Sequence, residues 1–201
     1  MISVIIATEN FRFLYKINEI LSDIKEIKTN HILPNQSIPS NVDVVITTEI
    51  EKQNIAFNTV FVPKAFNHYY LFSNIYLLAN NKSYFDSVVI GIDPGKTTGL
   101  AVLAEGEAIL GSAEFYTAVD TVKEIITVFF NVETSDLVIK VGQGGGQMKN
   151  EIVKRLNEIF HDKVPILIVN EDFTSQKKIE KFGNKIAKNI QSAILIAMKS
   201  N

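Results

Sequence analysis

The stretch Gly91-Ile92-Asp93-Pro94-Gly95-Lys96-Thr97-Thr98-Gly99 is the most informative part of the sequence. Apolar, β-branched residues precede its turn at 88–93 and a second apolar run follows at 99–104, a pattern that predicts two strands joined by a turn. Asp93 would end a buried strand, beside glycines that let a phosphate or a metal approach the backbone. An Asp-Pro-Gly turn can also simply cap a strand, so this stretch alone leaves both interpretations open.

The residues that follow predict a mixed sheet flanked by helices. A third strand is expected at 108–116, after a tight turn at 105–107. The later pattern alternates between helices and strands: helix 119–130, strand 136–141, helix 148–160, strand 164–169 and a long helix over about 174–199. The order is βββαβαβα, a meander of three strands followed by alternating helices and strands.

A small α/β domain is expected before this one. Strands are predicted at 2–7, 42–47 and 59–62, and helices at 11–24 and 69–78, with a loop rich in Pro, Asn and Ser between the first helix and the second strand. The polar, turn-forming segment Asn80-Asn81-Lys82-Ser83 separates a helical pattern from a fresh strand. We therefore expect one domain at 1–83, whose role the sequence does not reveal, and a second at 84–201.

Composition excludes several classes of protein. The 201 residues are 46% hydrophobic and 21% charged, with a net charge of -2, so a soluble globular chain is expected and any contact with nucleic acid must be local. The chain has no cysteine, which excludes disulfides, thiolate zinc sites and cysteine nucleophiles. The N-terminus does not have the pattern of a signal peptide, and no apolar run is long enough for a membrane helix. We expect a cytoplasmic protein that does not enter the membrane.

Two motifs resemble one known family. Gly91-Ile92-Asp93-Pro94-Gly95, followed by Thr98-Gly99-Leu100-Ala101-Val102, is similar to the opening hairpin of the RuvC/YqgF branch of the ribonuclease H-like superfamily. The segment 169–175 resembles the acidic stretch at the end of the corresponding YqgF strand. The resemblance covers about residues 85–201. It implies a ribonuclease H-like fold for 84–201 and a nucleic-acid-binding protein or nuclease, with a DNA junction or an RNA as partner.

The same resemblance implies a divalent metal site. Nucleases of this family hold Mg²⁺ or Mn²⁺ with several carboxylates, because hard cations prefer oxygen ligands. Asp93 and Glu171 would be the catalytic carboxylates and metal ligands, and Asp172 and Asn189 would be further ligands. Where the family places one or two Asp in its last helix, this chain has Asn189 and Ser192. An uncharged amide is a poor substitute, so we expect an incomplete site with weak or absent phosphodiester hydrolysis.

Several further residues are candidates for binding phosphate. A glycine-rich loop that includes Gly142, Gly144 and Gly145 follows one strand and precedes a helix, where backbone amides can hold an anion. In the implied fold it would lie at the same end of the sheet as the hairpin loop. The candidates there are Gly95, Lys96, Thr97 and Thr98. Lys177, Lys181 and Lys185 recur at helical spacing and would form a basic face for a phosphate backbone, or an ordinary solvated face.

Two other functions stay open from the sequence. The glycine-rich hairpin and loop could hold nucleotide phosphates in an actin-like domain, although a half of this length is short for that fold. The protein could also be a non-catalytic scaffold whose N-terminal domain recruits a protein partner or a second copy, as in a homodimer.

Overall fold

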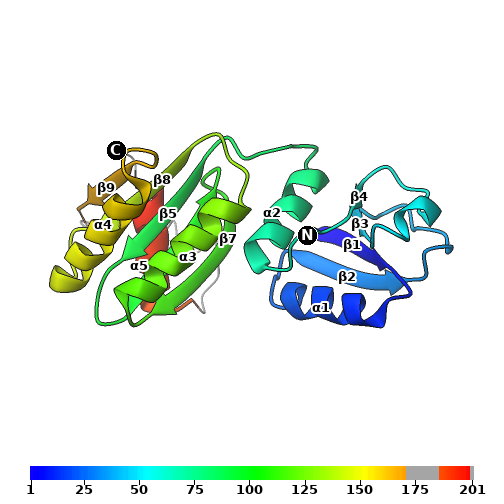
Figure 1. Cartoon of the computed structure of the whole chain (residues 1–201), viewed down its shortest axis with the longest axis horizontal. Helices are drawn as coiled ribbons and strands as arrows, with labels where there is room; N and C mark the ends of the chain where they lie inside the picture. The colour runs from blue at the N-terminus through cyan, green and yellow to red at the C-terminus, as the bar shows by residue number, and fades with distance from the viewer. Residues whose placement is uncertain (171–185, 200–201) are drawn as a thin grey trace. The chain divides into compact units, whose positions relative to one another are not determined.

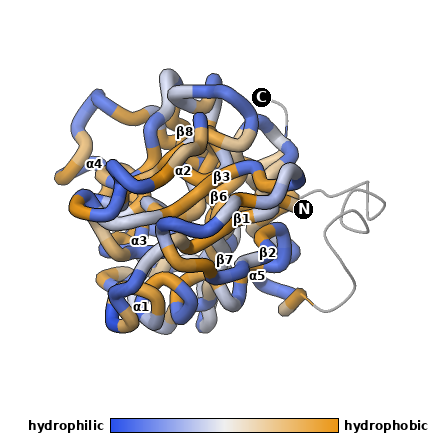
Figure 2. The backbone as a smooth tube through the Cα atoms, turned by 90° about the vertical axis from the view of Figure 1, so that its right-hand side faces the viewer, coloured by the Kyte–Doolittle hydropathy of each residue, from blue (hydrophilic) through white to orange (hydrophobic). Residues whose placement is uncertain are grey.

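The computed structural model describes residues 1–170 and 186–199, and the chain divides into two units, Met1–Ser83 and Tyr84–Asn201. Both units are α/β, and each has its own sheet (Figure 1). Hydrophobic residues concentrate along the strands, as in β6 of the second unit (Thr98–Ala104), which is buried throughout (Figure 2). No helix in the described ranges is both long and apolar enough to cross a membrane.

The first unit is a parallel sheet with two helices. Its elements in chain order are β1 (Ile2–Ala7), α1 (Phe11–Leu21), β2 (Ile27–Ile32), β3 (Val44–Ile46), the 3-10 helix η1 (Lys52–Asn54), β4 (Val60–Phe61) and α2 (His68–Ala79). The strand order is β2-β1-β3-β4. Asn10 and Asn67 cap the two α-helices, because each side-chain oxygen accepts from a backbone N–H three residues later.

The two faces of this sheet are covered differently. The helices pack against one another, α1 also contacts β2, and α2 contacts β3. On the opposite face Ile5, Ala7 and Val45 are buried under loop residues, among them Val42 and Phe57. The loops therefore cover the apolar residues on one face of the sheet, and the helices cover those on the other.

β2 was not among the strands predicted from the sequence, which placed residues 27–32 in a loop. Its sequence, Ile-Lys-Thr-Asn-His-Ile, is largely polar, and Lys28, Asn30 and His31 are exposed. β2 lies at the edge of the sheet and pairs only with β1 among the described strands. An edge strand whose side chains are largely exposed does not need the apolar run by which a buried strand is recognised.

The second unit contains the mixed sheet that the sequence predicts. Its elements are β5 (Val88–Asp93), β6 (Thr98–Ala104), β7 (Ala108–Phe115), α3 (Ala118–Asn131), β8 (Leu137–Gly142), α4 (Gly146–Phe160), β9 (Ile166–Val169) and α5 (Lys188–Met198). The sheet order is β7-β6-β5-β8-β9, with β5 at the centre, antiparallel to β6 and parallel to β8. The carboxyl ends of β5, β8 and β9 therefore meet at one edge of the sheet.

Helices cover both faces of this sheet. α3 and α4 pack together, with α3 against β7 and α4 against β8 and β9. α5 packs on the other face, where Gly91 lies beneath Ala193 and Ala197, and it contacts β5, β6, β7 and β8 (Figure 1). The face toward α5 is thus the one that carries Gly91 and, two residues later, Asp93.

The long helix predicted over about 174–199 is wrong at residues 186 and 187. Both are non-helical, and α5 begins at Lys188 after Ala187, whose ψ of 145° is extended. Residues 171–185 lie outside the described part of the chain.

Candidate functional site

Asp93 lies in a row of cross-strand partners that faces α5. It pairs with Gly99 of β6, and Gly99 pairs with Glu114 of β7. Partners directly opposite one another project on the same face of a sheet. The Asp93 and Glu114 side chains therefore flank Gly99, their Cα atoms two strand spacings, about 10 Å, apart. Sequence analysis did not identify Glu114, because only strand register shows that it lies in the row of Asp93.

The first turn of α5 packs directly on this row of residues. A Cβ at Gly99 would collide with the Asn189 carbonyl group and stand 3.0 Å from the Asn189 Cβ, so the helix backbone rests directly on the glycine. The Asn189 amide Nδ2 donates to Glu114 Oε1 over 2.9 Å. Gly99, which has no side chain, thus lies between Asp93, Glu114 and Asn189.

The glycine-rich loop adjoins the row on the β8 side. Gly145, in the left-handed conformation with φ of 77°, is the N-cap of α4. A Cβ there would stand 2.8 Å from the Pro94 Cβ, so the loop lies on the residue after Asp93. Gly144, Gly145 and Gly146 are exposed, whereas Gly142 is buried and ends β8. The structure therefore brings this loop and Asp93 together, as expected from the sequence.

Two hydrogen bonds hold Gln143, the first residue of the loop after β8. The Gln143 N–H donates to the Val169 carbonyl oxygen of β9 over 2.9 Å. The Lys149 ammonium reaches back from the first turn of α4 to the Gln143 carbonyl oxygen, 3.1 Å away. Lys149, which the sequence did not single out, thus adds a positive charge beside the exposed glycines.

The predicted phosphate-binding residues of the hairpin loop differ in accessibility. Lys96 is exposed, and Gly95 and Thr97 are half-buried. Thr98 is buried, and its hydroxyl lies 3.4 Å from the Gly95 carbonyl oxygen, closing the turn. Lys96 can therefore reach a ligand in solvent, while Thr98 holds the loop.

A buried lysine holds the other end of α5. Lys140, on β8, is 8% exposed, and its ammonium donates to the carbonyl oxygens of Ala197 and Lys199. Burial lowers the pKa of Lys140 below its usual value. The Lys199 ammonium in turn donates to the Asn170 carbonyl oxygen, just after β9. α5 is therefore fixed at its C-terminus to the strands whose carboxyl ends adjoin Asp93.

The remaining predicted residues lie outside the described part of the chain: Glu171, Asp172, Lys177, Lys181 and Lys185. Within residues 1–170 and 186–199, no three His, Asp or Glu side chains converge as metal ligands. The donors around Gly99 are two carboxylates and one amide. Such a set fits one weakly held hard cation better than a pair of cations, because a two-metal site needs more carboxylates.

Comparisons with known proteins do not assign a family. No family model matches the chain, and no curated protein matches it. Among solved structures, one similar chain is the Argonaute of Marinitoga piezophila, in a crystal structure in complex with 5' OH guide RNA and target DNA. It is 14% identical, with a TM-score of 0.32, and the match covers 86% of this chain and 39% of that one. Similarity at this level is too low to assign a fold or a function.

Proposed function

We propose that the second unit is a ribonuclease H-like domain, related to the RuvC/YqgF branch, that binds nucleic acid through a divalent metal at Asp93. The observation that carries the proposal is the position of Asp93. It lies at the carboxyl end of the central strand, with the glycine-rich loop on one side and Asn189 on the other. The strand order β7-β6-β5-β8-β9, with β6 antiparallel to its neighbours, supports the fold.

Each group around Asp93 has a distinct task in this proposal. Asp93 and Glu114 would supply carboxylate oxygens to Mg²⁺ or Mn²⁺, and Asn189 would supply its carbonyl oxygen. The bound metal would neutralise a phosphate of the nucleic acid and polarise its oxygens. The backbone of the exposed residues Gly145 and Gly146, at the N-terminus of α4, would hold a neighbouring phosphate, with Lys149 and Lys96 adding positive charge.

Binding is favoured over efficient hydrolysis. Phosphodiester cleavage with two metals requires carboxylates that hold both ions against the attacking and leaving oxygens. Asn189 contributes no charge, and its amide is already engaged as a donor to Glu114. We therefore expect weak or absent cleavage, even if Glu171 or Asp172 adds a further ligand.

The test compares wild type with Asp93→Asn in the full chain. Thermal melts with and without millimolar Mg²⁺ or Mn²⁺ report metal binding, and a mobility shift with labelled junction, single-stranded DNA and RNA reports nucleic acid. Asp162→Asn is the matched control, because Asp162 is an exposed residue in the turn after α4. The proposal predicts metal-dependent binding in wild type and the control, lost in Asp93→Asn.

Two results would contradict the proposal. If Asp93→Asn binds nucleic acid in a metal-dependent way as strongly as wild type, Asp93 does not hold the metal. If a fluorescent ATP analogue binds while no nucleic acid does, the glycine-rich segments hold a nucleotide instead. Cleavage assays on the same substrates then measure whether the incomplete carboxylate set retains any hydrolysis.

A further inference from the structure

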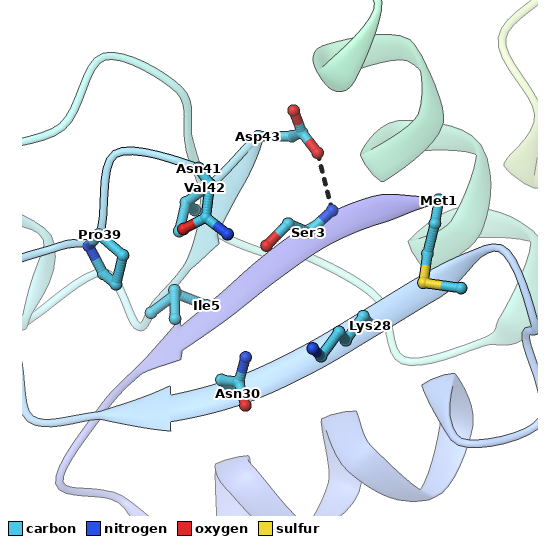
Figure 3. Close-up of a pocket in the computed structure, with 9 residues that line it drawn as sticks. All are labelled: Met1, Ser3, Ile5, Lys28, Asn30, Pro39, Asn41, Val42 and Asp43. Atoms are coloured by element: carbon cyan, nitrogen blue, oxygen red, sulfur yellow. Dashed lines mark hydrogen bonds between the residues drawn. The ribbon is translucent and has the colours of Figure 1, made fainter.

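The first unit has a pocket on the loop-covered face of its sheet, far in sequence from Asp93. The pocket has a volume of about 300 Å³ and lies near the amino ends of β1 and β2. Ser3 pairs with Lys28, and Ile5 pairs with Asn30, so these four side chains lie on one face. The segment from Pro39 to Asp43, which leads into β3, forms the opposite wall (Figure 3).

Hydrogen-bond donors converge on this pocket. Figure 3 shows the Lys28 ammonium, the Asn30 and Asn41 amides and the Ser3 hydroxyl turned toward one space above Ile5. In the part of the chain that the structure describes, the side chains of Lys28, Asn30 and Asn41 form no hydrogen bond with protein. Their donor capacity is therefore available to a ligand.

The one acidic side chain of the pocket is directed elsewhere. Asp43 Oδ2 accepts from the Ser3 backbone N–H over 2.7 Å, which holds the carboxylate at the rim (Figure 3). Among the side chains of the pocket, one positive charge, that of Lys28, is thus surrounded by neutral polar groups. A single negative charge is complementary to it, whereas a multiply charged anion would meet Asp43 at the rim.

The rest of the lining is apolar. Ile5 forms the floor, and Pro39 and Val42 form part of the wall. The volume corresponds to about ten waters at the liquid density, enough for an ion with a small hydrocarbon body. Polar surface predominates in this pocket, and these apolar side chains form a smaller part of its lining.

We propose that this pocket binds a small organic carboxylate, with the carboxylate on Lys28 and the hydrocarbon part on Ile5, Pro39 and Val42. The proposal does not depend on the function proposed for the second unit. It gives the first unit a ligand-binding role that no motif in the sequence indicated, since Lys28 and Asn30 lie on the strand that sequence analysis missed.

The test is an NMR titration of the ¹⁵N-labelled full chain with benzoate. The signals observed are the backbone and side-chain amides of Asn30 and Asn41 and the backbone amide of Ser3. Benzamide, which has the same shape without charge, and inorganic phosphate are titrated separately. Lys28→Met keeps most of the side-chain stem and removes the charge. Lys25→Met is the matched control, because Lys25 is exposed and does not line the pocket.

The proposal predicts saturable shifts of these signals with benzoate in wild type and in Lys25→Met. Lys28→Met should bind about tenfold more weakly, since it lacks one charge-assisted hydrogen bond. Asn41→Asp, which adds a negative charge to the pocket wall, should weaken binding as well. The proposal is overturned if benzoate causes no shifts at these positions, if Lys28→Met binds as tightly as wild type, or if benzamide or phosphate binds as tightly as benzoate.

Discussion

The backbone of Asn189 rests on Gly99, the residue between Asp93 and Glu114 in the sheet. A side chain at position 99 would occupy the place of the Asn189 carbonyl group. The same type of contact recurs at Gly91, where a Cβ would stand 2.8 Å from the Ala197 Cβ. These two glycines let α5 approach the sheet closely enough for Asn189 to reach Glu114.

Gly99→Ala is therefore expected to push the first turn of α5 off the sheet. Overpacking at such a contact destabilises a fold by about 1–3 kcal/mol. Hydrogen exchange of the full chain, measured by mass spectrometry, should show faster exchange in peptides that contain residues 188–198. Gly95→Ala is the control, since its Cβ would meet only the Thr97 carbonyl oxygen at 3.3 Å. Equal exchange in the two variants would show that the contact at Gly99 is not tight.

Asn189→Asp is expected to strengthen metal binding. The new carboxylate would stand where the amide now bonds to Glu114 at 2.9 Å, adding a third negative charge to the site around Gly99. Without metal, repulsion between the two carboxylates should lower the melting temperature. With Mg²⁺ or Mn²⁺, the apparent affinity should rise about tenfold over wild type, measured from the metal dependence of the melt.

Adding Asp93→Asn to Asn189→Asp should cancel most of that gain. Unchanged metal response in the single variant would contradict the assignment of these residues to one site. Glu114→Gln, which keeps an acceptor for Asn189, separates the charge of Glu114 from its hydrogen bond.

Glu51 is expected to make the stability of the first unit depend on pH. Its carboxylate accepts from Thr8 Oγ1 at 2.7 Å, from Thr48 Oγ1 at 2.6 Å and from the Glu9 N–H at 2.6 Å. Burial raises the pKa of Glu51, but these hydrogen bonds outweigh burial, and the net pKa is lowered below 4.5. The stabilisation is therefore present at neutral pH and is lost as the pH falls from about 4.5 through the lower folded-state pKa.

Glu51→Gln should accordingly cost about 1 kcal/mol at pH 7, a value reduced by the partial exposure of the site, and less at pH 3. Urea unfolding of the full chain at both pH values measures the difference. Glu49→Gln, at an exposed neighbouring position, is the control. A cost for Glu51→Gln that is equal at both pH values would rule out ionisation of Glu51 as its source.

Lys140 is expected to change stability in the same direction as Glu51, but at alkaline pH. Burial lowers its pKa in the folded protein, so the unfolded chain binds more protons as the pH approaches 10.5, and the cost of burying the charge is relieved as the pH rises. Relative to Lys140→Met, wild type should therefore gain stability between pH 7 and pH 10. Comparing the two proteins cancels the titration of other groups. A constant difference across this range would show that the lowered pKa is absent.

The sequence predicts the strands of the second unit well because they are buried. β5, β6 and β8 are largely apolar runs bounded by Gly, Pro or charged residues, and along the chain a meander is followed by alternating helices and strands. β2 could not be found this way, since a strand that contains exposed Lys28 and Asn30 lacks an apolar run. The helix predicted through residues 186 and 187 was extended over them by the spacing of its side chains, and spacing does not show where a helix begins.

The residues of the candidate site also differ in whether the sequence could reveal them. Asp93 and the glycine-rich loop could be found because each follows a recognisable strand. Glu114 could not, since an acidic residue near the end of an edge strand is ordinary until register places it opposite Gly99. Lys149 was missed for a similar reason, as its role depends on a contact to the Gln143 carbonyl oxygen.

The contact between Gly145 and Pro94 fixes the distance between two chemically different parts of the surface. The exposed glycine-rich loop and the strand end that carries Asp93 meet there through backbone atoms, and neither part depends on a long side chain for its position. The separation between the loop and Asp93 would therefore be set before a ligand with two phosphates binds. Two phosphates at the matching separation would then be preferred over a single phosphate. The loop would thus select its ligand by the distance between phosphates.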